Sequence, residues 1–251
     1  MLNYVKNKGI QNEHEFVEYF NKRKVKELNP MANDFIKSIF PNVIENDIIY
    51  AIPRLDKGKT DFILIINEIE KKISLKKGYS NSIHLEKIES FVNFLRNIGI
   101  NEETIKLFIK FHYEDGSLDG SGENRLSSEN YKQLYQNKID KINLEFNKED
   151  IIKKAINRFI ISGRYHDNVD VLVHGTIYDF FWINKEEIFK IMLAKKDNYS
   201  TDVHFGLLYC QPWTRNLQYK QSDEYKREYV QIKWHNLLDN IIEIMAFYRE
   251  N

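Results

Sequence analysis

The stretch that decides the fold runs from residue 59 to residue 89 and reads KTDFILIINEIEKKISLKKGYSNSIHLEKIE. Residues 61–66 are expected to form a β-strand, because this run is rich in isoleucine, and residues 71–76 are expected to return antiparallel to it. The residues between them, 67–70, are few and mostly polar, as in a tight turn. The stretch therefore predicts an antiparallel hairpin at the centre of the fold.

The register of this hairpin decides which side chains meet. A turn centred between Glu68 and Ile69 would place Asp61 opposite Lys76. Opposed residues share one face of a sheet, with Cβ atoms roughly 5 Å apart. Asp61, Ser74 and Lys76 are therefore expected to lie on one face, at the open end of the hairpin.

A helix is expected directly after the hairpin. Gly78 ends the second strand, and residues 80–82 are Ser-Asn-Ser, three favourable N-cap residues in a row. Apolar residues at helical spacing then continue to Gly99. Glu86 and Glu89 would stand in the first turns of this helix, near the ends of the strands.

The segments around the hairpin extend it to an α/β fold. Residues 11–39 predict two helices, and residues 47–52 predict a strand before the hairpin. The run IKLFIKFH, residues 105–112, is expected to be a further strand. The elements then follow the order αβββαβ, with a mixed sheet flanked by helices. Three acids of the first helix are interpreted mainly as a solvated face, from which one could reach a metal: Glu13, Glu15 and Glu18.

The rest of the chain continues with helices and strands, without an internal repeat or a linker rich in Pro, Gly or Ser. We therefore expect one domain over residues 1–251, with a core at about residues 11–112. Residues 113–251 would be a C-terminal elaboration that carries DNA-recognition elements. The elements expected there are helices at 128–145 and 148–162 and strands at 169–176, 179–183 and 204–209.

Composition excludes several classes of protein. The chain has 37 basic and 37 acidic residues, so its net charge is neutral. Binding of nucleic acid would therefore depend on a local basic groove that contacts the phosphates. The single cysteine, Cys210, excludes an intramolecular disulfide and a cysteine-based zinc cluster. No run approaches 18 apolar residues and the N-terminus has no apolar signal core. A soluble cytoplasmic protein is the expectation.

The side chains gathered by the hairpin suit phosphodiester hydrolysis. Mg²⁺ binds one or two carboxylates and completes its coordination with water and phosphate. A neighbouring lysine can orient the water or stabilise the developing charge. Asp61, an acid at the start of the next helix and Lys76 would meet these needs.

The pattern GKTDFILI, followed after seven residues by ISLK, resembles the PD-(D/E)xK nuclease superfamily. The resemblance implies the αβββαβ fold, Mg²⁺ as cofactor and catalytic roles for Asp61, Ser74 and Lys76. Ser74 stands where the second acid of the motif is usual. A subgroup of type II restriction endonucleases is similar in having SxK, with the missing carboxylate supplied by the following helix. The metal ligands would then be Asp61 and either Glu86 or Glu89, and the choice between the two glutamates stays open.

Other polar residues are candidates for contact with nucleic acid. Lysines surround the hairpin, and the mixture of amide, basic and aromatic residues near the C-terminus suits base edges and phosphates. A solvated rim, a helix cap or core packing would explain the same residues. The candidates are Lys59, Lys77, Asn81, Ser82, His84, Gln211, Arg215, Asn216 and Lys233.

Three functions remain open. The favoured one is a Mg²⁺-dependent endonuclease of duplex DNA, a type II restriction enzyme or a related defence nuclease, acting as a homodimer because duplex DNA is itself twofold. The second is a nucleic-acid-binding protein that keeps the nuclease fold without catalysis. The third is an unrelated α/β binding protein. A helix glutamate converging on Asp61 would favour the enzyme.

Overall fold

The computed structural model describes residues 8–54, 58–78, 81–122, 125–163, 167–196, 200–212 and 221–249. Contacts between Cα atoms divide the chain into two compact units. Unit 1 consists of residues 1–80, 160–189 and 237–251, and unit 2 consists of residues 81–159 and 190–236. The expectation of a single domain stays a prediction.

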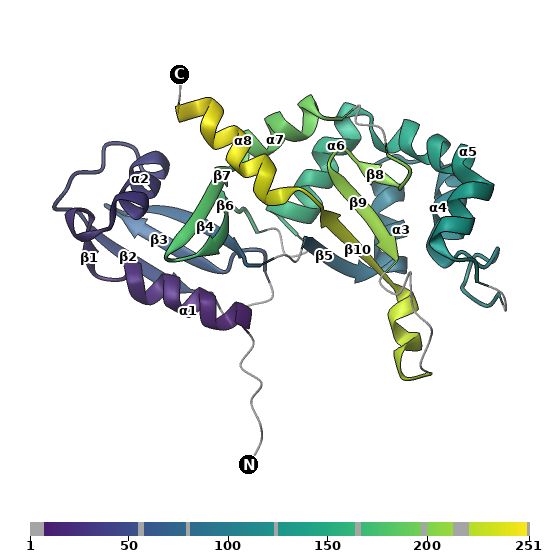
Figure 1. Ribbon diagram of the computed structural model, residues 1–251, viewed down its shortest axis with the longest axis horizontal. Coiled ribbons are helices and arrows are strands. Elements are labelled where there is room, and N and C mark those ends of the chain that lie inside the picture. The colour runs from purple at the N-terminus through teal and green to yellow at the C-terminus, as the bar shows by residue number, and fades with distance from the viewer. Residues whose placement is uncertain are drawn as a thin grey trace, which may run out of the picture. The chain divides into compact units, whose positions relative to one another are not determined.

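Unit 1 is built on a six-stranded mixed sheet with the order β1-β2-β3-β4-β6-β7 (Figure 1). Neighbouring strands are antiparallel except for β4 and β6, which are parallel. This mixed α/β architecture confirms the predicted fold class. The strands are β1 (Arg23–Lys24), β2 (Ile48–Pro53), β3 (Phe62–Ile66), β4 (Ile69–Lys76), β6 (Val171–Thr176) and β7 (Asp179–Asn184).

The β3–β4 hairpin forms with a register that differs by two residues from the prediction. Asn67 and Glu68 both have positive φ, 47° and 66°, as in the two-residue turn that matches the twist of a hairpin. Phe62 therefore faces Ile73, and Asp61 stands opposite Ser74 instead of Lys76. Because side chains alternate with a period of two, this shift keeps the acid and the lysine on the same face.

Aromatic packing holds helix α1 (Lys8–Phe20) against one face of the sheet of unit 1. This helix lies along β2 and β3 (Figure 1). The ring of Phe16 lies 5.9 Å from that of Phe62 and 5.3 Å from that of Phe180. The other elements are η1 (Val25–Glu27), α2 (Pro30–Ile39), α7 (Lys185–Ala194), which continues into unit 2, and α8 (Leu237–Arg249).

Unit 2 contains a four-stranded antiparallel sheet with the order β5-β10-β9-β8 (Figure 1). Its first strand corrects the sequence prediction, because residues 82–87 form β5 and the following helix begins only at Ile88. The partner of β5 is β10, which is distant in the sequence, so local N-cap preference could not reveal the pairing. The strands are β5 (Ser82–Lys87), β8 (His204–Phe205), β9 (Leu208–Pro212) and β10 (Tyr229–Trp234).

The run at residues 105–112 is helical, which makes the predicted strand there wrong. Asn101 caps this helix, because its side chain accepts a hydrogen bond from the N–H of Thr104 at 3.0 Å. Ile105, Phe108 and Phe111 are buried at helical spacing. The last strand of the predicted order is instead β6, after the first segment of unit 2. The helices are α3 (Ile88–Asn97), α4 (Glu102–Tyr113), α5 (Ser128–Phe146), α6 (Glu149–Ile156), η2 (Asn157–Ile161) and η3 (Gln221–Glu228).

No helix within the described ranges is long and apolar enough to cross a membrane.

Gly175 in β6 is predicted to tolerate no side chain. Its φ is +132°, and an added Cβ would collide with the carbonyl oxygen of Asp179 in β7. Gly175→Ala is expected to lower the free energy of unfolding by about 2 kcal/mol or more, measured by urea denaturation. Gly78→Ala is the control, because Gly78 also has positive φ, +76°, but has no atom near its added Cβ. Equal losses of stability in the two variants would contradict the prediction.

Candidate active site

Asp61 is held across the β3–β4 hairpin by hydrogen bonds to one of its carboxylate oxygens. Its Oδ2 accepts from the N–H of Leu75 at 2.5 Å and from the hydroxyl of Ser74 at 3.3 Å. The backbone N–H of Asp61 donates to the carbonyl of Ile73 at 2.8 Å. The Ser74 side chain, 2% exposed as a residue, therefore orients the acid.

A second carboxylate, that of Glu13 on α1, lies within electrostatic reach of this acid. Burial raises the pKa of Glu13, and the negative charge of Asp61 raises it further. The positive charges of Lys76 and His14 act in the opposite direction. The charges of Asp61 and Lys76 therefore both act on the carboxylate of Glu13, and we call these three residues of unit 1 the charge cluster.

A hydrogen bond between α1 and β6 fixes the position of Glu13. The amide of Asn12 is fully buried and donates to the carbonyl of Gly175 at 2.9 Å. The register of β6 places the preceding residue, His174, beside Lys76, and its Nε2 lies 3.1 Å from the carbonyl oxygen of Gly78. The end of β6 therefore contacts both the helix that carries Glu13 and the segment that follows Lys76.

The segment entering β3 is fixed by Asp167, a residue that sequence reasoning missed. Its carboxylate accepts from the backbone N–H groups of Lys59 and Thr60 at 2.7 and 2.8 Å, and from Arg54 at 2.6 Å. Burial raises the pKa of Asp167, but these hydrogen bonds and the charge of Arg54 hold it below its usual value. Asp167 therefore anchors the two residues that precede Asp61.

Glu86 lies in unit 2, on strand β5 and not at the start of a helix. It is 1% exposed, and its Oε2 bonds to Arg158 at 2.8 Å and accepts from Ser90 at 2.9 Å. Its Oε1 lies 3.4 Å from the Nε2 of His84. Glu89 is exposed on α3 in the same unit. The two predicted helix ligands are therefore one buried ion-pair partner and one surface residue.

The predicted DNA-contact residues fall in both units. Lys59 and Lys77 belong to unit 1, and Arg215 and Asn216 lie outside the described residues. Ser82, Gln211 and Lys233 come together on one sheet of unit 2. Two further residues have structural roles in unit 2. The backbone carbonyl of Asn81 accepts a hydrogen bond from the N–H of Trp234, and the ring of His84 packs on that of Phe159.

The donor set of unit 1 fits a magnesium ion. Over the described ranges there is no group of three or more His, Cys, Asp or Glu side chains that could hold a metal. Mg²⁺ needs fewer, since it is bound through one or two carboxylates with water and substrate phosphate in the remaining positions. Glu13 and Asp61, two acids whose charges act on each other, supply such a pair.

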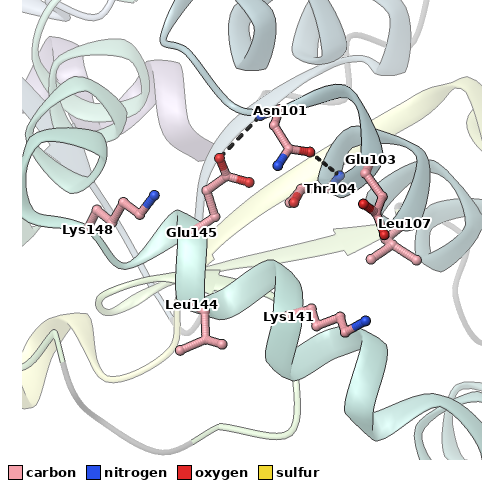
Figure 2. A pocket seen from close by; sticks show the side chains of 8 residues that line it. All are labelled: Asn101, Glu103, Thr104, Leu107, Lys141, Leu144, Glu145 and Lys148. Carbon is pink, nitrogen blue, oxygen red and sulfur yellow. Dashed lines mark hydrogen bonds between the residues drawn. The ribbon is translucent and has the colours of Figure 1, made fainter.

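A pocket of about 380 Å³ lies in unit 2 between α4 and α5, and none of the candidate site residues described above lines it. Figure 2 shows that Glu145 accepts from the backbone N–H of Asn101, at 3.2 Å, beside the N-terminus of α4. Acidic and basic side chains both line the pocket, so it has no distinct preference for an anion. The lining residues are Asn101, Glu103, Thr104, Leu107, Lys141, Leu144, Glu145 and Lys148.

The ion pairs of Glu86 predict acid-sensitive stability. Burial raises the pKa of Glu86, but hydrogen bonds and charges of His84 and Arg158 outweigh burial and lower the pKa from 4.5 to about 2. Because the pKa of Glu86 is lower in the folded chain, its carboxylate stabilises the fold at pH values above the pKa of the unfolded chain, 4.5. This stabilisation is lost as the pH falls towards about 2. The shift corresponds to roughly 3 kcal/mol.

Glu86→Gln is therefore expected to lose less stability than the parent chain when the pH falls from about 4.5 to about 2. The free energy of unfolding, measured by urea denaturation across this range, is the readout. Glu89→Gln removes an exposed acid of the same type and should retain the parental pH dependence. A parental pH dependence in Glu86→Gln would contradict the assignment.

Comparison with known proteins supports the fold. No protein-family model matches the chain, and no curated protein matches it. A solved structure that is similar is that of the restriction endonuclease MspI in complex with its cognate DNA, with a TM-score of 0.57 and 14% sequence identity. The similarity covers 90% of this chain and 88% of that chain. This chain thus has a restriction-endonuclease-like fold.

Proposed function

We propose that the chain is a Mg²⁺-dependent endonuclease that hydrolyses phosphodiester bonds of duplex DNA, as a type II restriction enzyme or a related defence nuclease. The observation that carries this proposal is the charge cluster of unit 1, where Asp61 is pinned across a hairpin beside Lys76 and Glu13. Two carboxylates with a lysine supply both the ligands for a hard metal ion and a cation for a phosphate.

Each residue of the cluster has a distinct role in this reaction. Asp61 and Glu13 would hold the metal, which when bound lowers the pKa of a water and neutralises charge on the phosphate. Lys76 would orient the attacking water and stabilise the charge that develops on the phosphate oxygens. Ser74 donates its hydroxyl to Asp61, so it acts through the orientation of that acid.

Glu13 replaces the helix glutamates in the proposed metal site. The carboxylate of Glu86 is bonded to Arg158 and Ser90, and releasing it would leave the half-buried guanidinium of Arg158 without this partner. Glu89 is exposed, and its role as a ligand stays a prediction. What supports Glu13 as a ligand is its electrostatic interaction with Asp61.

The proposed partner is duplex DNA, and the proposed assembly is a homodimer in the cytoplasm. The similar structure, MspI, is described in complex with its cognate DNA, which supports DNA as the ligand of this fold. Two copies related by a twofold axis would bring one cluster to each strand of the duplex. The alternative is a DNA-binding protein without catalysis, which the small number of carboxylates in the cluster favours.

The cluster predicts which substitutions abolish cleavage. Asp61→Asn and Lys76→Ala should each lower the rate of Mg²⁺-dependent cleavage roughly a hundred- to a thousandfold, with unchanged thermal stability. Mixed plasmid and phage DNA is the substrate, and discrete bands would show sequence specificity. Lys71→Ala, on the same strand, is the matched control. Wild-type cleavage in either variant would overturn the assignment, and no cleavage by the parent chain would favour the binding protein.

The proposed metal role of Glu13 has a separate test. Glu13→Gln removes the charge while keeping the shape, so cleavage should require a higher Mg²⁺ concentration. Binding of Ca²⁺, followed by calorimetry, should weaken by roughly tenfold, since a charged ligand becomes neutral. Glu18→Gln, at an exposed position on the same helix, should bind Ca²⁺ as the parent chain does. Equal Ca²⁺ affinity in both variants would exclude Glu13 as a ligand.

A further inference from the structure

The outer face of the sheet in unit 2 collects polar side chains from three distant segments. Strand β10 alternates between half-buried and buried residues, and so does β9. The buried sides include Ile232, Trp234 and Cys210, and helices α3 and α4 contact these strands. The side chains of the outer face are those of Ser82, Leu85, Lys87, Tyr209, Gln211, Tyr229, Gln231 and Lys233.

This outer face is basic although the whole chain is neutral. The outward-facing side chains named above include two lysines, Lys87 and Lys233, and no acid. Within the described part of the chain, neither lysine has a carboxylate at ion-pair distance. The acid at the β8 edge, Asp202, is bonded to the ammonium group of Lys132 at 2.8 Å. The face therefore presents two ammonium groups to a polyanion.

One row across the face has the chemistry that reads base pairs. Gln231 in β10 faces Leu85 in β5 on one side and Gln211 in β9 on the other. Glutamine pairs with the N6 and N7 of adenine, and an apolar side chain contacts the methyl group of thymine. Three strands span roughly 10 Å, which is less than the major-groove width of about 12 Å.

The row is also preorganised. The amide nitrogen of Gln231 donates to the hydroxyl of Ser82 at 3.0 Å, which fixes the side chain before any ligand arrives. Leu85 is 39% exposed, a large apolar residue on the edge strand of this face. An exposed leucine beside two amides is explained by a partner that has apolar and polar groups in alternation, as base-pair edges do.

The aromatic residues favour duplex over single-stranded nucleic acid. Single strands bind through aromatic rings on which bases stack. The ring of Tyr209 is already stacked against that of His235, with centroids 4.5 Å apart and planes at 9°. Its other neighbour is His204, at 5.7 Å and 28°. Two histidine rings therefore already pack against Tyr209, and the amides and the lysines of the face are the groups offered to a ligand.

We propose that this face of unit 2 binds duplex DNA, with the row Leu85–Gln231–Gln211 reading A·T pairs in the major groove. Lys87 and Lys233 contact the flanking phosphates. The inference deepens the proposed nuclease function, because it assigns sequence recognition to a surface separate from the cluster at Asp61. Recognition requires no metal and no hydrolysis, so it is testable by binding alone.

The phosphate contacts are tested with a random-sequence duplex library in EDTA. Replacing both Lys87 and Lys233 by Gln should weaken binding to all duplexes and reduce the slope of log affinity against log salt by about 2. The control replaces Lys141 and Lys148, which line the pocket of Figure 2, by Gln and should leave the slope unchanged. The same slope in the first variant and the parent chain would overturn the inference.

The base contacts are tested by selection from the same library, with Ca²⁺ as the metal. The parent chain should enrich sites that contain A·T pairs in EDTA as well as in Ca²⁺, because recognition requires no metal. Gln231→Ala should reduce the preference at one position roughly tenfold. Ser82→Ala, which frees the Gln231 amide, should reduce it less. Gln136→Ala on α5 is the control, and its enriched sites should match those of the parent chain. Unchanged enrichment in Gln231→Ala, or tighter binding of single strands than of duplexes, would overturn the inference.

These outcomes separate the two proposals. A parent chain that selects A·T sites but never cleaves DNA would support the recognition face and overturn the nuclease. A parent chain that cleaves DNA while the variants of the face bind and select as it does would overturn the recognition face alone.

Discussion

The carboxylate of Asp61, held by the N–H of Leu75 and the hydroxyl of Ser74, is the interaction on which the candidate site depends. It joins the first residue before β3 to the end of β4, so the acid cannot turn away from the neighbouring Lys76. The serine in the place of an acid therefore has a physical role.

Around this carboxylate, unit 1 uses backbone contacts to position charged side chains. Asp167 fixes the two residues before Asp61, and Asn12 fixes α1 against Gly175. Gly175 has a backbone conformation that favours glycine, and its carbonyl meets the buried amide of Asn12. Glu13 follows Asn12 directly, so the hydrogen bond that fixes the helix also fixes the acid. Buried polar groups are costly without partners, and here they position the charged groups.

Unit 2 combines a buried charged centre with a basic outer face. Glu86, Arg158 and Ser90 form a bonded group beneath β5, whereas the opposite side of the same sheet carries amides and lysines. Strand alternation separates these two functions, because neighbouring residues point to opposite faces. Gln231 and Ile232 are adjacent in the sequence, yet one is half-buried on the outer face and the other is buried in the core.

The sequence by itself determined the hairpin, its face and the α/β class, because strand propensity and period-two alternation are local properties. It also predicted that Asp61, Ser74 and Lys76 share one face of the hairpin, which the strand register confirms. Only the tertiary structure decided the surroundings of the other acids. The charge of Asp61 acts on Glu13 because α1 packs on the sheet, and Glu86 pairs with Arg158 in unit 2, where β5 joins a sheet built from residues far along the chain. The strand expected at 105–112 failed for a related reason, since an apolar run fits a buried helix as well as a strand. Long-range pairing chooses between alternatives that local preference leaves nearly equal in free energy.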